Sequence, residues 1–145
     1  MNKVRDILER KGYEYYYIHP ENSVFEALQT MAEKEIGAVM VVEDGNLAGM
    51  FTERDYARKI VLHGFTSREA KVGDFMTKTV ITVSSETSIG DCMTLMTSKR
   101  IRHLPVLDKN KIIGLISIGD VVNLIIHQQG ETIKDLENYI YGGKM

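Results

Sequence analysis

Two short polar motifs are the parts of this sequence whose residue types and spacing could do chemistry. Thr52 precedes Asp55 by three positions, and Ser117 precedes Asp120 by the same spacing. A hydroxyl at a helix N-cap accepts a hydrogen bond from the third amide of the helix, so both motifs fit a capping role. A helix N-terminus can also hold phosphate, and an ionised carboxylate accepts hydrogen bonds from ribose hydroxyls. Each motif therefore predicts a helix start and is a candidate contact for phosphate and ribose groups.

The two motifs belong to a longer internal repeat. Residues 18–60 align without a gap on residues 83–125, at an offset of 65 positions. Within this alignment Gly49 falls on Gly114, and most remaining pairs match an apolar residue with an apolar residue. Two copies with so long a period do not fit a solenoid. The repeat predicts two small units packed about a pseudo-twofold axis, with two related clefts.

Both copies predict the same order of elements. A capping box or cap at Ser23 or Ser88 opens an amphipathic helix, and Gly37 is expected to end the first of these helices. Buried strands, turns and a second helix follow, and β-prone segments precede each copy. The first copy comprises a β-prone segment 13–18, strands 38–42 and 47–51 around turn 44–46, and a helix 52–62. The second comprises a β-prone segment 79–83, strands 103–107 and 111–116 around turn 108–110, and a helix from 117.

The predicted fold class is α/β (α+β), built from two β-α-β-β-α units with pseudo-twofold symmetry. We expect the first unit, with an N-terminal segment, over residues 1–67 and the second over residues 68–130. A C-terminal helical tail is expected over 131–145, with its helix at Glu131–Tyr141. At 145 residues the chain has room for one compact domain, or for two halves that cannot each bury enough surface alone.

This doubled pattern resembles the tandem cystathionine-β-synthase-type (CBS) domain pair, often called a Bateman module. Residues 72–77 (VGDFMT) look like the family's D-x-M-T segment, and residues 102–106 read RHLPV. Residues 114–120 (GLISIGD) match the family's G-h-h-[ST]-x-x-D element, and residues 49–55 (GMFTERD) repeat it. The resemblance implies sensing of adenosine-containing ligands such as AMP, ATP, NAD(H) or S-adenosylmethionine, without implying catalysis.

The resemblance also implies which residues bind, because the family's matching aspartate contacts ribose. We expect at least Asp120 to contact the nucleotide, with Arg102 and His103 as phosphate partners. Thr82 is a candidate for the adenine edge. The first copy has Gly37 and Ala38 where the second has Arg102 and His103, so we expect the first cleft to bind more weakly. The full set of candidate ligand-binding residues is Thr52, Arg54, Asp55, Thr82, Arg102, His103, Pro105, Ser117, Gly119 and Asp120.

Several of these residues also have plain structural interpretations. Arg102 could be a solvated helix-end residue favoured by the helix dipole, and Gly119 could simply suit a turn. Arg54, with Arg58, could lie on a solvated helix face. Cys92 stands where the first copy has Ala27, so we expect it to be a core residue.

The other residue patterns predict neither a metal site nor an enzyme. The four histidines show no i, i+3 or i, i+4 pairing, and no catalytic motif or phosphate-binding loop is present. A net charge of −2 argues against a nucleic-acid surface, and no apolar run approaches the roughly 18 residues of a membrane span. One cysteine and a charged N-terminal segment without a signal-peptide core predict a cytoplasmic protein.

We therefore expect a stand-alone regulatory module that binds an adenine nucleotide between its repeats and passes its signal either to an unidentified effector protein or to self-assembly. The alternative is a protein-interaction or scaffold module with vestigial clefts. The apolar helices after Asp55 and Asp120 predict a homodimer, to which Ile133, Leu136 and Ile140 of the tail could contribute.

Overall fold

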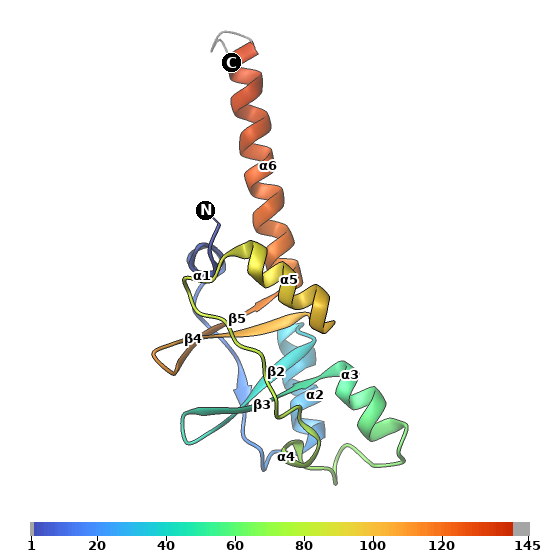
Figure 1. The fold of residues 1–145 in the computed structure, drawn as a ribbon. Coiled ribbons are helices and arrows are strands. Elements are labelled where there is room, and N and C mark those ends of the chain that lie inside the picture. Colours follow the sequence, from blue (N-terminus) through green and yellow to red (C-terminus); the bar gives the residue numbers. More distant parts are fainter. Residues whose placement is uncertain (1, 141–145) are drawn as a thin grey trace.

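The computed structural model describes the backbone of residues 2–140 and the side chains of residues 2–130. Figure 1 shows the two repeated units and the long last helix, which extends away from them. The first part of the chain contains α1 (Val4–Lys11), β1 (Tyr17–Ile18), α2 (Val24–Lys34), β2 (Ala38–Glu43), β3 (Asn46–Thr52), α3 (Glu53–Asp55) and the π-helix η1 (Tyr56–Val61). The second contains α4 (Val72–Phe75), α5 (Ile89–Lys99), β4 (His103–Asp108), β5 (Lys111–Ser117) and α6 (Ile118–Ile140). This mixed α+β architecture confirms the predicted fold class.

The two sheets repeat the same antiparallel hairpin. Strand β2 pairs with β3 so that Val41 faces Gly49, and β4 pairs with β5 so that Val106 faces Gly114. In the first unit β1 adds a short parallel strand beside β2. These registers agree with the offset of the sequence repeat, and the predicted hairpins are confirmed.

The predicted strand over residues 79–83 is wrong, because only Val83 makes a bridge, to Val106. The Val83 amide donates to the Pro105 carbonyl over 3.0 Å. Continuing this parallel ladder toward residue 81 would need an amide hydrogen on Pro105, which proline lacks. The first unit has Met40 at that position, and there β1 forms over Tyr17–Ile18, although it is shorter than the predicted segment 13–18.

Helices α2 and α5 start and end alike. The hydroxyls of Ser23 and Ser88 accept hydrogen bonds from the third amide of each helix, which confirms the predicted caps. The prediction that Gly37 ends α2 is wrong, since the helix ends at Lys34 and Glu35 takes the left-handed conformation. Arg100 takes the same conformation after α5. A charged residue therefore occupies the position that glycine usually fills at a helix end.

The helices after the two polar motifs differ from each other. The helix predicted over residues 52–62 is a single α-helical turn, α3, continued by the π-helix η1. Helix α6 instead runs on without a break, so the separate tail helix predicted from Glu131 is part of it. The tail residues named above as dimer contacts lie outside the residues whose side chains are described.

Each unit has its own core, and the segment before each unit packs into the other. Val4 and Leu8 of α1 are fully buried in the core of the second unit. Val72 of α4 is buried in the core of the first unit. A third cluster joins the two sheets, with Met40 and Met50 packed near Val80, Ile112 and Leu115. The crossed segments therefore fix how the units sit together.

Candidate functional site

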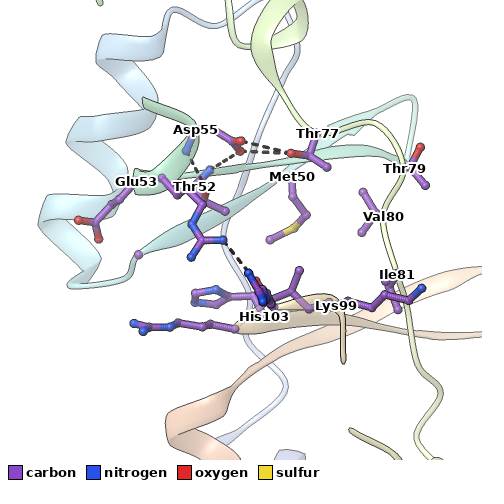
Figure 2. A pocket seen from close by; sticks show the side chains of 15 residues that line it. Met50, Thr52, Glu53, Asp55, Thr77, Thr79, Val80, Ile81, Lys99 and His103 are labelled. Carbon is purple, nitrogen blue, oxygen red and sulfur yellow. Dashed lines mark hydrogen bonds between the residues drawn. The ribbon is translucent and has the colours of Figure 1, made fainter. Parts of the chain in front are cut away.

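A cavity of about 550 Å³ lies between the two units (Figure 2). Its volume falls within the range typical of small-molecule sites. The first unit contributes Gly37, Met50 and the segment 52–55, and the chain between the units contributes Thr77, Thr79, Val80 and Ile81. The second unit contributes the five residues 99–103, where α5 ends and β4 begins. Both units are therefore needed to form it.

Asp55 is the one charged residue that is buried among residues 2–130, with 7% of its surface exposed. Its carboxylate accepts hydrogen bonds from the Thr52 amide at 3.0 Å and from the Thr77 hydroxyl at 3.3 Å. The Asp55 amide donates to the Thr52 hydroxyl over 3.1 Å. This reciprocal pair confirms the capping role predicted for the first motif.

Lys59 supplies the charge that balances Asp55. Its ammonium group lies 3.1 Å from the Asp55 carboxylate and also donates to the Phe75 carbonyl over 3.0 Å. A buried carboxylate costs free energy unless it is paired and hydrogen-bonded, and here both conditions are met. The carboxylate is therefore held in a fixed position while its residue lines the cavity.

The backbone at the start of α3 has little capacity left for an anion. The Glu53 amide donates to the Gly37 carbonyl over 3.1 Å, and the Asp55 amide is bonded to Thr52. The helix is only three residues long. A phosphate in this cavity would therefore depend mainly on side chains, rather than on the helix N-terminus expected from the sequence.

Basic side chains from both units also line the cavity. Lys99, Arg100 and Arg102 come from the second unit, and Arg54 comes from the first. The Arg54 guanidinium donates to the Arg100 carbonyl over 3.4 Å, a contact that joins the two units across the cavity. The cavity therefore combines the carboxylates of Glu53 and Asp55 with a group of cations, which suits a ligand carrying both hydroxyls and phosphate.

His103 lies at the same wall. Burial lowers its pKa below the usual value, the Asp120 carboxylate opposes this change, and Lys11 and Arg102 reinforce it. Its imidazole is therefore neutral at neutral pH, when it can donate one hydrogen bond and accept another. Gly37 lies beside His103, where a Cβ would make an ordinary contact with His103 at 3.9 Å and a tight contact with the Glu53 side chain at 3.0 Å.

The structure brings together half of the residues predicted as ligand contacts. Thr52, Arg54, Asp55, Arg102 and His103 line the cavity. The five that do not line it are Thr82, Pro105, Ser117, Gly119 and Asp120. The sequence assigned Arg102 and His103 to the cleft of Asp120, yet they line the cavity of Asp55. The pseudo-twofold arrangement is the reason, since the start of α3 in one unit faces the start of β4 in the other.

The second polar motif forms its own closed set of contacts. The Ser117 amide donates to the Asp120 carboxylate over 2.8 Å, and the Asp120 amide donates to the Ser117 hydroxyl over 3.2 Å. The predicted capping role is confirmed here too. Lys11 of α1 adds an ion pair to Asp120 at 2.8 Å.

Sequence reasoning missed several cavity residues. Thr77 stands in the segment that resembles the family's D-x-M-T pattern, but only the fold brings its hydroxyl to Asp55. Val80 and Ile81 supply an apolar wall, and Lys99 and Arg100 were visible as basic neighbours of Arg102. Among the described residues, no group of three or more His, Cys, Asp or Glu side chains could hold a metal ion.

Comparisons with known proteins agree with this architecture. The family model for the CBS domain matches residues 4–62 and again residues 72–127. The mitochondrial CBS domain-containing protein CBSX3 of Arabidopsis thaliana is 40% identical over 97% of this chain and 72% of its own. A solved CBS-domain protein from Burkholderia ambifaria is 46% identical, covering 88% of this chain and 96% of its own, with a TM-score of 0.84. CBSX2, solved in complex with AMP, is 25% identical over 89% of this chain and 99% of its own, with a TM-score of 0.72.

Proposed function

The chain belongs to the CBS-domain family, and from this premise we propose that it is a regulatory module that binds an adenine nucleotide beside Asp55. The observation that carries the proposal is the cavity between the units, where a buried carboxylate faces several basic side chains. CBSX2 was solved with AMP, which supports AMP as the first ligand to test. ATP and NAD(H) remain in the proposal as related ligands.

Each part of a nucleotide has a chemically suitable wall in this cavity. The Asp55 carboxylate, held by Thr77, would accept hydrogen bonds from two adjacent ribose hydroxyls. Arg102 and Arg54 would bind phosphate through charge-assisted hydrogen bonds. Val80 offers an apolar surface for the base. The proposed roles in binding ribose, phosphate and base match the chemistry of these residues, and mutation of each residue can test its role.

A ligand panel tests this function directly. The full chain is heated with AMP, ADP, ATP, NAD, NADH or S-adenosylmethionine, each at millimolar concentration. A ligand at 100 times its dissociation constant stabilises the folded state by about 2.7 kcal/mol, which raises the melting temperature by roughly 5–10 °C in a chain of this size. If no ligand shifts the melting temperature, and calorimetry detects no heat of binding, the nucleotide proposal fails.

A protein-interaction role is the second candidate, and exposed apolar side chains favour it. Leu62 and Phe65 follow η1 with 77% and 52% of their surfaces exposed. Val122 and Ile126 of α6 are 46% and 59% exposed. Apolar side chains gathered on a surface mark contacts with another protein. We propose that they form a homodimer interface, and an effector protein would be the alternative occupant.

We propose the cytoplasm as the location. No helix within the described residues is long and apolar enough to cross a membrane. Cys92 is a free, fully buried thiol, which fits a reducing compartment. The relative CBSX3 is named as mitochondrial, and imaging of a tagged full-length chain would distinguish the two compartments.

A further inference from the structure

The aspartates of the two motifs are each paired with a lysine, but the two lysines come from different places. Asp55 pairs with Lys59, which lies four positions further along the chain in η1. The position equivalent to Lys59 in the second unit is Leu124, which is 1% exposed and belongs to the core. Asp120 instead receives its cation from Lys11, which lies 109 positions earlier in the chain, at the end of α1.

Lys11 makes two bonds at this position. Its ammonium group lies 2.8 Å from the Asp120 carboxylate and donates to the Leu115 carbonyl over 2.9 Å. The same carboxylate oxygen accepts from the Ser117 amide. One carboxylate oxygen of Asp120 is therefore bonded to both Ser117 and Lys11, and Lys11 comes from a helix outside the repeat.

Helix α1 is firmly attached to the second unit, so Lys11 is held there by packing as well as by charge. The Val4 amide donates to the Thr87 carbonyl and the Arg5 amide to the Ser85 carbonyl, each over 2.9 Å. Leu8 is fully buried and packs so closely on β5 that a Cβ at Gly114 would lie 2.7 Å from its Cδ2. Figure 1 shows α1 on the side of the β4–β5 hairpin.

By the offset of the repeat, the second unit's position also has fewer cations on the opposite unit, where Lys34, the counterpart of Lys99, is the one basic residue among the counterparts of residues 99–103. Arg100, Arg102 and His103 line the cavity of Asp55. Their counterparts, 65 positions earlier, are Glu35, Gly37 and Ala38. One is an acid, and the other two carry no polar side chain. Phosphate bound near Asp120 would therefore meet a carboxylate where the Asp55 cavity offers an arginine.

We infer that Lys11, together with the lack of arginines on the opposite wall, closes the position around Asp120 to nucleotides, so that the chain holds a single nucleotide, beside Asp55. This inference rests on the proposed function for the number of ligands bound, while the closing contact itself is independent of it. The pseudo-twofold symmetry of the fold thus does not extend to ligand binding.

Isothermal titration of the full chain with AMP tests the single site. We expect one AMP per chain, and we expect Asp120→Asn to change the dissociation constant by less than two-fold. Asp55→Asn should weaken binding at least ten-fold. Lys11→Gln should also leave the stoichiometry at one, because the opposite wall there has no counterpart of Arg100 or Arg102 that could bind phosphate. Two AMP per chain, or a ten-fold loss with Asp120→Asn, would overturn the inference.

A measurement without nucleotide tests the closing contact. The unfolding equilibrium is measured by urea for the wild type, Lys11→Gln, Asp120→Asn and the double variant. We expect the two changes to be coupled, by roughly two- to five-fold in the unfolding constant at low salt. Lys109→Gln, at an exposed turn, is the control. Its effect on the free energy of unfolding should add to that of Asp120→Asn without coupling.

A failure of the proposed nucleotide function can be distinguished from a failure of the closing contact between Lys11 and Asp120. If AMP and the other nucleotides do not bind but Lys11 and Asp120 are coupled, the proposed function fails and the closing contact stands. If AMP binds while Lys11 and Asp120 are additive, the nucleotide function stands and Lys11 does not close the second position.

Discussion

Arg102 and Asp55 line one cavity although they belong to different copies of the repeat. Arg102 directly precedes β4 of the second unit, and Asp55 ends the α3 turn of the first. The site is therefore composite, and neither unit carries it alone. From this relationship we expect the position beside Asp55 to bind more tightly, which is the opposite of the order expected when the two copies are compared position by position.

The first prediction concerns the two aspartates. Asp55→Asn should weaken AMP binding by at least ten-fold, because an amide replaces a charged acceptor whose hydrogen bonds contribute about 1.5–3 kcal/mol. The helix cap should survive, since the remaining oxygen can still accept from the Thr52 amide. Calorimetric titration measures the affinity, and thermal unfolding measures the stability.

Asp44→Asn is a matched control, because Asp44 lies at the exposed β2–β3 turn with a positive φ that asparagine tolerates. Its affinity should equal that of the wild type. Equal affinities for Asp55→Asn and wild type, combined with a large loss of stability, would reduce Asp55 to a structural residue.

The second prediction separates phosphate recognition from recognition of the nucleoside. Arg102→Gln removes a cation from the cavity wall, so AMP should bind roughly ten-fold more weakly while adenosine binds nearly as before. Arg58→Gln serves as the control, because Arg58 is exposed and does not line the cavity. If AMP and adenosine lost affinity equally, Arg102 would shape the cavity and would not bind the phosphate.

Much of the fold was predictable because both copies of the repeat carry the same short sequence patterns for caps, strands and turns. The caps at Ser23 and Ser88 and the hairpins around the two turns follow from short patterns and appear as expected. Pro105 was also visible, and its missing amide hydrogen could have excluded the predicted strand over residues 79–83.

Half of the site was not predictable, since an internal alignment compares equivalent positions and does not show which positions face each other. The alignment shows that Arg102 is equivalent to Gly37. It does not show that Arg102 lines the cavity of Asp55. Lys11 lies before the aligned region, so nothing in the repeat connects it to Asp120. Both relationships arise from packing between the units, where α1 crosses to the second core.

The third prediction uses pH. Burial lowers the pKa of His103, so the folded state disfavours its protonation relative to the unfolded chain. The stabilising contribution of the neutral imidazole is therefore complete above the unfolded value of about 6.5 and is lost as the pH falls through the lower folded value. The melting temperature should fall as the pH is reduced from 7.5 to 5.

His103→Gln should flatten this dependence over the same range. The carboxylates of Glu21 and Glu86 have pKa values lowered by hydrogen bonds to Lys71 and Lys3, so their effects begin only below about pH 4.5. If the melting temperature falls equally in the variant and the wild type between pH 7.5 and 5, His103 does not cause the pH dependence.

The last prediction concerns assembly. Leu62 after η1 and Ile126 of α6 expose 77% and 59% of their surfaces, and they follow the two polar motifs in a chain with pseudo-twofold symmetry. Such symmetry favours an isologous pairing of two chains, in which the same apolar surfaces meet across a true twofold axis. Light scattering after gel filtration should give twice the monomer mass of 16.4 kDa at micromolar concentration. Leu62→Lys with Ile126→Lys should give the monomer, because a buried interface cannot solvate two added charges, whereas Lys109→Glu at the exposed turn should remain dimeric. A wild-type mass near 16.4 kDa would contradict the homodimer and leave these surfaces to an effector protein.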